Sequence, residues 1–393
     1  LSPQLSAGPV VVSSVVVSSV VVSSVVVSSA VGILGAWSVR GLIGLIARRH
    51  ARYIFFLVAA MVFLLSLVTP ILGLEHASGW DIAVLELMHL TTAAVAVVSV
   101  EWGLRPVWGW GRQEYTPRPP GWALVTGATS GIGAEVAVQL AVAGWQVIGI
   151  GRSPEKARAV EERAGTNLSV LTGDLSLLNH AGRIGAQADT MTQTGFDLVV
   201  HAVGTLKPSS QPTPEGIDSN IATSFLSRVA VSRAVRLRPG ARVVNLAAAE
   251  HGKLPKMFRR ELATLDDFGT GMASHGAAQL ANDIWVARLR RSGVDAWGYG
   301  PGSVDTGIRR ALPAPMRVLM RPLFWAETRQ PADAAADVVR LGTDTGLPGD
   351  AGGFGSREGL FVHDPFIHAP ERQERLGALL DKLLPTKGRT DAR

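Results

Sequence analysis

A glycine-rich turn at residues 126–133 has the composition of a phosphate-binding loop. It reads Thr126-Gly127-Ala128-Thr129-Ser130-Gly131-Ile132-Gly133 and stands between an apolar run and a helix-like stretch. Glycines permit the tight turn and the close approach of backbone to a pyrophosphate, and the helix N-terminus offers free N–H groups to the anion. Because the strand–turn–helix context is also present, the turn predicts a dinucleotide site.

A basic side chain follows the next apolar run and bears on which dinucleotide binds. That run ends Gly149-Ile150-Gly151-Arg152-Ser153, with no acidic residue. An NAD site has a carboxylate here that accepts hydrogen bonds from the ribose 2′-hydroxyl, whereas Arg152 can pair with a 2′-phosphate. The sequence therefore predicts NADP(H). The alternative, an exposed arginine at a strand end, stays open.

The composition excludes several other chemistries. The chain of 393 residues has no cysteine, which excludes disulfides, thiolate metal sites and a cysteine nucleophile. The net charge is +6, but the arginines are scattered, so no nucleic-acid partner is predicted. His201, His251 and His275 could line one cleft, but no carboxylate or ligand spacing accompanies them, and no metal is predicted.

Short apolar runs alternate with helix-like stretches from residue 122 to the end of the chain. This alternation predicts an α/β fold, a doubly wound parallel sheet with helices on both faces. The last stretch, 371–384, has the pattern of a closing amphipathic helix. The apolar runs are 122–126, 145–150, 196–200, 241–247 and 294–299, and the helix-like stretches are 131–144, 154–164, 214–236 and 270–292.

Most of the strongly apolar sequence lies before residue 104. Residues 54–74 carry no charge, and 21 residues are enough to cross about 30 Å of hydrocarbon. Residues 82–100 form a second candidate span and 30–47 a weaker third one. Arginines flank these spans, while the loop 75–81 has no Lys or Arg, so the positive-inside rule places everything after residue 104 in the cytoplasm. The sequence predicts a multi-pass membrane protein with two to three transmembrane helices in 30–104.

Three smaller features complete the N-terminal part. Residues 1–29 contain a Val-Val-Val-Ser-Ser repeat, whose period of five matches neither helix nor strand and is interpreted as low complexity without function. Glu86 and His89 have the Glu-x-x-His spacing of di-iron bundles, but a single copy favours a polar helix face. Residues 105–121 contain four prolines and are interpreted as a linker to the domain 122–393.

The glycine spacing of the turn, TGxxxGIG, resembles the cofactor signature of the short-chain dehydrogenase/reductase family, and the resemblance covers about residues 120–393. Asp174-Leu175 stands where the family places an Asp beside the adenine. Residues 301–306, Pro-Gly-Ser-Val-Asp-Thr, are similar to the loop that closes over the nicotinamide. Leu280-Ala281-Asn282 and His251-Gly252 are most similar to the retinol-dehydrogenase-like branch, which handles lipophilic alcohols, aldehydes and ketones. Residues 55–100 are similar to small multi-span bacterial proteins of unknown function, which implies no activity.

The resemblance implies a fold and a set of cofactor contacts. The fold would have about seven parallel strands in the order 3-2-1-4-5-6-7. Residues 310–330, apolar and bounded by prolines, would form a lid on the substrate side or lie on the membrane surface. The implied cofactor-binding residues are Thr126, Gly127, Thr129, Ser130, Gly131, Ile132, Gly133, Arg152, Asp174, Leu175, Gly204, Pro301, Gly302, Val304 and Thr306.

The catalytic residues of the family are replaced in this chain. The family uses a Ser, a Tyr and a Lys, and these positions hold Ala248, His275 and Gln279. No Tyr-x-x-x-Lys occurs anywhere, since the chain has only three tyrosines, Tyr53, Tyr115 and Tyr299. His275 can titrate near neutrality, with an ordinary pKa of about 6.5. Asn220 falls at the position of the family's active-site Asn.

Two main interpretations follow from retained cofactor residues and replaced catalytic residues. The first is a membrane-tethered NADP(H)-binding protein that has lost ordinary dehydrogenase chemistry and acts as a sensor or scaffold. The alternative is an active NADP(H)-dependent oxidoreductase on a lipophilic alcohol, aldehyde or ketone, with His275 as proton donor and Asn220 ordering water. A third places the main activity in the membrane segment, regulated by the domain. A homo-oligomer stays open in each case.

Overall fold

The computed structural model describes residues 110, 114–209, 211–246, 259–306, 329–356 and 359–385. All of them belong to the second of two compact units, Val107–Arg393. No helix in these ranges is both long and apolar enough to cross a membrane. Several sequence predictions concern residues outside these ranges: the repeat, the three candidate spans with Glu86 and His89, Ala248, His251 and most of the lid 310–330.

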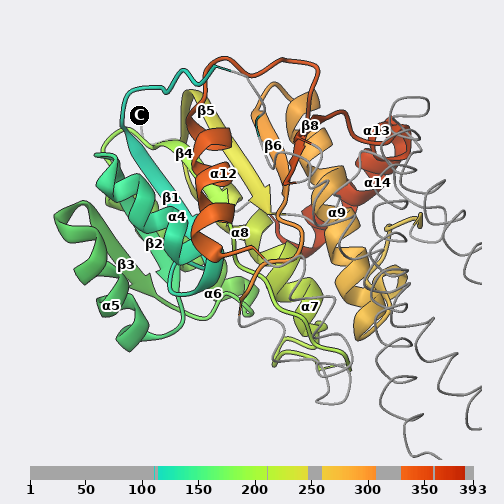
Figure 1. Cartoon of the computed structure of the whole chain (residues 1–393). Coiled ribbons are helices and arrows are strands. Elements are labelled where there is room, and N and C mark those ends of the chain that lie inside the picture. Colours follow the sequence, from blue (N-terminus) through green and yellow to red (C-terminus); the bar gives the residue numbers. More distant parts are fainter. Residues whose placement is uncertain are drawn as a thin grey trace, which may run out of the picture. The chain divides into compact units, whose positions relative to one another are not determined.

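A single sheet forms the centre of the domain (Figure 1). Its order β3-β2-β1-β4-β5-β6-β7-β8 confirms the predicted α/β fold and the order of its first seven strands, all parallel. The prediction of about seven strands missed β8, which pairs antiparallel with β7 and is too short to give a sequence pattern. The strands are β1 Trp122–Thr126, β2 Gln146–Gly151, β3 Leu168–Thr172, β4 Phe196–His201, β5 Leu237–Leu246, β6 Asp295–Gly300, β7 Gly353–Gly355 and β8 Gly359–Phe361.

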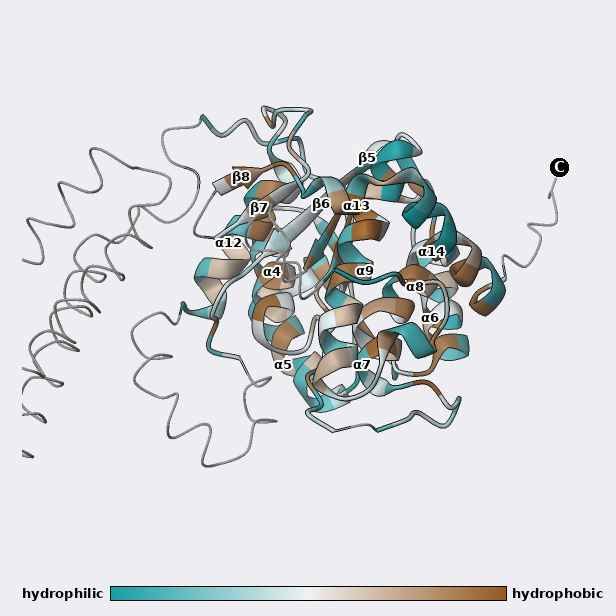
Figure 2. Cartoon of the chain, turned by 90° about the vertical axis from the view of Figure 1, so that its right-hand side faces the viewer, coloured by the Kyte–Doolittle hydropathy of each residue, from teal (hydrophilic) through white to brown (hydrophobic). Residues whose placement is uncertain are grey.

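Helices cover both faces of the sheet. On one face, α12 (Pro331–Thr343) packs beside α4 (Gly131–Val142), which also contacts α5 (Pro154–Ala164); on the other, α6 (Leu178–Thr190) packs on α8 (Ser227–Ala234) (Figure 1). Helices α6 and α14 carry both hydrophilic and hydrophobic positions (Figure 2), as helices do when one side faces a core. The remaining elements are α7 Ser219–Ile221, the π-helical η2 Ala222–Leu226, α9 Met272–Arg291, α13 Pro365–His368, α14 Pro370–Leu383 and the short 3₁₀ turns η1 Gly165–Asn167 and η4 Asp266–Phe268.

Successive side chains of a strand point to opposite faces of the sheet, so the hydrophobic core is divided between those two faces. In β1, Ala123 and Val125 belong to the cluster under α4 and α12, whereas Leu124 belongs to the cluster under α6 and α8. All three are fully buried. A strand buried on both faces reads as a continuous apolar run, which is why these strands were visible in the sequence.

The helix-like stretch 214–236 is shorter in the structure than in the prediction. It begins at Ser219 because the Asp218 carboxylate caps the turn, accepting a hydrogen bond from the Asn220 backbone N–H at 2.9 Å. It ends at Ala234 because the chain turns into β5 at Leu237. Between these ends it passes through the π-helical segment η2, where π-helical turns often accompany functional sites.

Part of the predicted linker 105–121 is bound to the domain. The Thr345 N–H donates to the Thr116 carbonyl, and the Arg118 N–H donates to the Thr343 carbonyl, both at 2.8 Å. Trp110 stacks on Phe354 of β7 with ring centroids 4.2 Å apart. Residues 114–121 therefore run along the end of α12 before they enter β1.

Candidate functional site

The glycine-rich turn has the geometry of an anion site. Gly127 and Gly131 have positive φ angles of 73° and 57°, which favour glycine. A Cβ on Gly133 would lie 2.4 Å from the Gly127 carbonyl oxygen, so only glycine lets α4 start this close to the turn. No side chain caps α4 at Ser130, and its first turn holds no acid. The free N–H groups of this helix end fit a pyrophosphate.

The end of β2 lies beside this turn. A Cβ on Gly151 would lie 2.2 Å from the Thr129 side chain, so the two segments are in direct contact. Arg152 is exposed at this strand end, and within the described part of the chain no hydrogen bond or ion pair holds its guanidinium. Its five N–H donors are therefore available to a phosphate beside the turn.

The remaining predicted contacts of the adenine side lie at the carboxyl ends of neighbouring strands. Asp174 and Leu175 follow β3; Leu175 is buried, and the Asp174 carboxylate accepts from the Ser176 N–H at 2.9 Å. Thr126 ends β1 and is buried, with its hydroxyl oxygen 3.4 Å from the Val203 N–H. Ile132 and Gly204 are accessible. The parallel sheet thus collects these residues at one edge, where open α/β sheets bind ligands.

The loop at 301–306 closes the same site from the other side. It follows β6 and contains Gly302 with a φ angle of 64°. The Thr306 methyl group lies 3.2 Å from where a Cβ on Gly131 would stand, so the loop touches the phosphate turn. In this loop Pro301 is half-buried and Val304 is buried. The backbone of Arg329 holds the loop, since its N–H donates to the Ser303 carbonyl at 2.9 Å and its carbonyl accepts from the Asp305 N–H at 3.0 Å.

Asn220 is buried and fully engaged by the protein. Its side-chain oxygen accepts from the Lys207 N–H at 2.8 Å, and its amide donates to the carbonyls of Lys207 and Gly271 at 3.0 and 2.8 Å. The Ser274 hydroxyl lies 3.1 Å from the same amide nitrogen. Asn220 therefore connects the loop after β4 to the start of α9 by hydrogen bonds. The predicted water-ordering role stays a prediction, and the side chain has no spare donor for it.

His275 lies on the first turn of α9, half-buried, with Nδ1 3.1 Å from the Thr205 carbonyl oxygen. Burial lowers its pKa below 6.5; the hydrogen bond to Thr205 opposes this shift, and the Arg228 charge adds to it. A carbonyl only accepts, so Nδ1 carries a proton and Nε2 of the neutral ring is an acceptor. His275 is therefore a base at neutral pH and an acid only when protonated.

The other candidate groups near His275 differ in what they can do. Gln279 follows one turn later on α9; its side-chain oxygen is buried and has no hydrogen-bond partner in the described ranges. Tyr299 is buried and bonds to Asp337 at 3.2 Å, so it is no proton donor to a ligand. His201 is buried against Ser232 at 2.7 Å, and burial lowers its pKa to about 3. The described residues contain no group of three His, Asp or Glu that could hold a metal.

Sequence reasoning missed Arg228. It is 2% exposed, and its guanidinium donates to the Val203 carbonyl, the Asn245 side chain and the Leu246 carbonyl, the last two at 2.6 and 2.5 Å. Arg228 therefore joins the carboxyl ends of β4 and β5 at the centre of the site. The only signal in the sequence is a cation inside an apolar helix-like stretch, which alone does not distinguish a buried residue from an exposed one.

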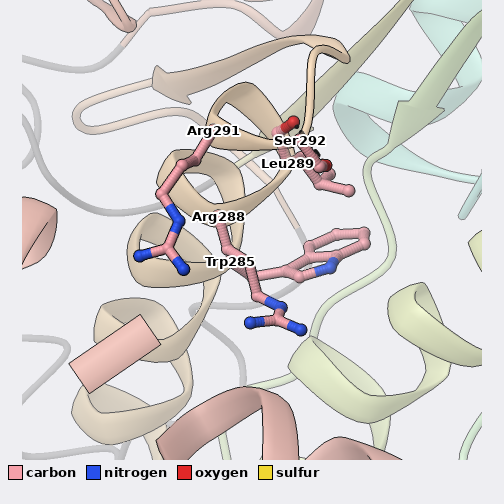
Figure 3. A pocket seen from close by; sticks show the side chains of 5 residues that line it. All are labelled: Trp285, Arg288, Leu289, Arg291 and Ser292. Carbon is pink, nitrogen blue, oxygen red and sulfur yellow. Dashed lines mark hydrogen bonds between the residues drawn. The ribbon is translucent and has the colours of Figure 1, made fainter. Parts of the chain in front are cut away.

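A surface pocket lies away from this site (Figure 3). It is lined by Trp285, Arg288, Leu289, Arg291 and Ser292 from the last turns of α9, next to the amino end of β6. Arg288 donates to the Gln373 carbonyl at 3.2 Å, and Arg291 pairs with Glu374 at 2.9 Å. These cations hold α14 against α9, and the pocket is at the opposite end of the helix from His275.

The fold is of the doubly wound α/β class, and the glycine-rich turn at the carboxyl edge of its sheet fits a phosphate group. Comparison with known proteins narrows this class, since residues 121–256 match the family described as short chain dehydrogenase. Residues 121–256 are thus similar to short-chain dehydrogenases, and the order of the parallel strands is that of a Rossmann-type sheet.

Three similar proteins illustrate the relationship. Dehydrogenase/reductase SDR family member 13 of Bos taurus is 26% identical over 238 residues, covering 57% of this chain and 63% of that protein. Retinol dehydrogenase 11 of Mus musculus is 26% identical over 57% of this chain and 74% of its own length. The solved 3-oxoacyl (acyl-carrier-protein) reductase from Agrobacterium tumefaciens C58 with NADP bound is 22% identical over 59% of this chain and 91% of its own, with a TM-score of 0.46. The match to the first relative spans less than two thirds of that relative's length.

Proposed function

We propose that this protein binds NADP(H) and transfers hydride slowly between that cofactor and a lipophilic carbonyl or alcohol, with His275 moving the proton. The observation that carries the proposal is the pairing of an uncapped, acid-free α4 N-terminus with Arg152 beside it, whose guanidinium no described residue binds. These are the two features that a pyrophosphate and a 2′-phosphate require. The cofactor contacts are the fifteen residues that the sequence predicts between Thr126 and Thr306.

A nicotinamide cofactor held by these residues would supply or take the hydride. In carbonyl reduction, protonated His275 gives its Nε2 proton to the substrate oxygen; in alcohol oxidation, neutral His275 takes that proton at Nε2. The Thr205 carbonyl holds Nδ1 and orients the ring at 3.1 Å. Gln279 bears no charge, and the Ser position is occupied by Ala248, so both other catalytic groups of the family are missing. General acid–base catalysis typically contributes about 10²–10⁴-fold, so a weakened set predicts slow turnover.

The lipophilic substrate class is supported by relatives and by the N-terminal sequence. One relative is named a retinol dehydrogenase, and retinol is a lipophilic alcohol. The predicted membrane spans at 54–74 and 82–100 would tether the domain on the cytoplasmic side of a membrane, where such substrates concentrate. The segment 310–330 would form the substrate-side lid.

A second candidate function is a sensor or scaffold that binds NADP(H) without turnover. It is favoured by Gln279, which stands in the family's Lys position and whose side-chain oxygen is buried without a described partner. A neutral amide cannot tune the pKa of a neighbouring proton donor.

The experiment is NADPH binding to the full chain in detergent micelles, followed by cofactor fluorescence, with NADH as the reference. We expect NADPH to bind at least tenfold more tightly than NADH, about 1.4 kcal/mol. A panel of lipophilic ketones and aldehydes then separates the two candidates, because turnover that is lost in His275→Ala supports the enzyme. Binding without any turnover supports the sensor, and no NADPH binding contradicts both.

A further inference from the structure

Arg228 is a buried cation at the centre of the site, and no carboxylate of the described residues pairs with it. It lies at the start of α8, and within the described ranges no carboxylate forms an ion pair with it. The acid that acts on it is Asp283 of α9, which is itself buried and whose pKa burial raises to about 8. Burial favours the neutral form of Asp283 and also lowers the pKa of Arg228 to about 9, so the guanidinium keeps its positive charge at pH 7 in a setting where charge is weakly screened.

Arg228 and His275 both bind the short loop that follows β4. The Arg228 guanidinium donates to the Val203 carbonyl at 3.1 Å from Nε, and the His275 ring donates to the Thr205 carbonyl at 3.1 Å. Gly204 stands between these two carbonyls, and Arg228 Nη2 lies 3.5 Å from where a Cβ on Gly204 would be. A fixed positive charge therefore lies one loop away from the imidazole, on the cofactor-facing edge of the sheet.

We infer that Arg228 is a positioning residue that supplies, from α8, the positive charge that Gln279 does not supply from α9. The inference rests on the proposed function of His275. A nearby cation disfavours the imidazolium, so His275 releases its Nε2 proton more readily to a carbonyl oxygen. In that step the Nε2–H bond breaks, an O–H bond forms, and hydride from NADPH completes the alcohol, leaving NADP⁺ and neutral imidazole.

Other charged groups around His275 stay constant when Arg228 is changed. Asp218 caps α7 and accepts from the Ser274 hydroxyl at 2.7 Å, next to His275 in the chain. Lys207 lies on the loop that His275 contacts, and Asp283 lies two turns further along α9. Burial of His275 is the larger cause of its lowered pKa, so the contribution of Arg228 must be measured as a difference between variants.

The test compares Arg228→Gln with Arg228→Lys in the full chain, without cofactor. The rate of His275 carbethoxylation by diethyl pyrocarbonate is followed against pH by peptide mass spectrometry, because the reagent attacks neutral imidazole. We expect Arg228→Gln to raise the His275 pKa by about half a unit or more, and Arg228→Lys to leave it near the wild-type value. The exposed His368, whose surroundings include Arg290 and Asp364 but not Arg228, is the internal control.

A second variant protects the test against loss of folding. Asn245→Asp keeps the size of the side chain that Arg228 contacts at 2.6 Å and places a carboxylate against the guanidinium, with loss of the hydrogen bond that Asn245 donates to Asn282 at 2.9 Å. It should raise the His275 pKa in the same direction. An unchanged His275 pKa in a folded Arg228→Gln or Asn245→Asp protein overturns the inference. Since no cofactor is present, this outcome is separate from failure of NADPH binding, which would contradict the proposed function instead.

Discussion

The two halves of the site differ in how their polar groups are used. In the half built by β1, α4 and β2, groups are left free: the α4 N-terminus has no cap, and Arg152 has no partner in the described ranges. In the half built by α7, α8 and α9, polar groups bind one another: Asn220 and Arg228 each make several internal hydrogen bonds. The first half leaves polar groups available to a ligand. The second half uses its polar groups to hold a loop, and His275 is its available titrating group.

This difference separates a part of the site that depends on backbone shape from a part that depends on single side chains. A phosphate turn depends on backbone shape, so replacing any of its glycines disrupts it directly. Proton transfer depends on single side chains, which can be exchanged without disturbing the fold. The predictions below test the two halves separately.

The largest effect is expected in the cofactor half, from Gly133→Ala. The added Cβ would lie 2.4 Å from the Gly127 carbonyl oxygen and would displace the turn from α4. We expect NADPH affinity to fall by about 100-fold or more, roughly 2.7 kcal/mol, in fluorescence titrations. Gly182→Ala in α6 is the matched control, since nothing lies within 4 Å of its added Cβ. Equal affinities in the two variants would contradict the assignment of the turn.

The next effect tests the proton-transfer half through His275→Ala. Removal of the imidazole should lower turnover by about tenfold or more while NADPH affinity stays unchanged, because the ring acts on the substrate and not on the phosphates. His368→Ala, which removes an exposed histidine from α13, is the control. Turnover at the wild-type rate in His275→Ala would remove His275 from the mechanism.

The pH dependence of wild-type turnover follows from the lowered pKa of His275. Its protonated form predominates only below that pKa, which lies under 6.5. Carbonyl reduction, which needs the proton, should therefore increase as the pH falls below 6.5, and alcohol oxidation should be favoured above it. Initial rates in both directions between pH 5 and pH 8 check this, and a reduction rate that rises with pH would contradict it.

A smaller effect concerns cofactor choice. Arg152→Ala should reduce the preference for NADPH over NADH by about tenfold, or 1.4 kcal/mol, because one cation facing the 2′-phosphate is lost. Arg158→Ala, on the exposed side of α5, changes the same net charge and should leave the preference intact. If both variants lower the preference equally, general electrostatic attraction is responsible and Arg152 makes no specific contact.

The smallest effect is on stability, through Asp283. Burial raises its pKa from 3.8 to about 8, so its contribution is full below pH 3.8 and is lost as the pH rises through 8. The stability of Asp283→Asn relative to the wild type should therefore increase as the pH rises from 3.8 to 8, and the gain at pH 8 should be at least about 1 kcal/mol in thermal or denaturant unfolding. Asp350→Asn, which removes an exposed carboxylate, is the matched control.

The sequence predicted the backbone-determined features of the domain and missed those that depend on individual side chains. Trp122–Thr126 and Pro154–Ala164 were predicted with their observed bounds, because strand runs and capped helices have periodic patterns. The sequence did not predict three features: the hydrogen bonds of Asn220, the buried position of Arg228 and the antiparallel strand β8. Each depends on partners distant in the chain, such as Asn245 for Arg228, and no local pattern reports such contacts.

The most direct test of the account measures cofactor affinity and turnover together in the full chain and in His275→Ala. The account predicts that both proteins bind NADPH equally and at least tenfold more tightly than NADH, about 1.4 kcal/mol, and that His275→Ala reduces a lipophilic carbonyl at least about tenfold more slowly than the wild type. Equal affinity for NADPH and NADH, or no binding of either, would contradict the claim that the cofactor half of the site is intact.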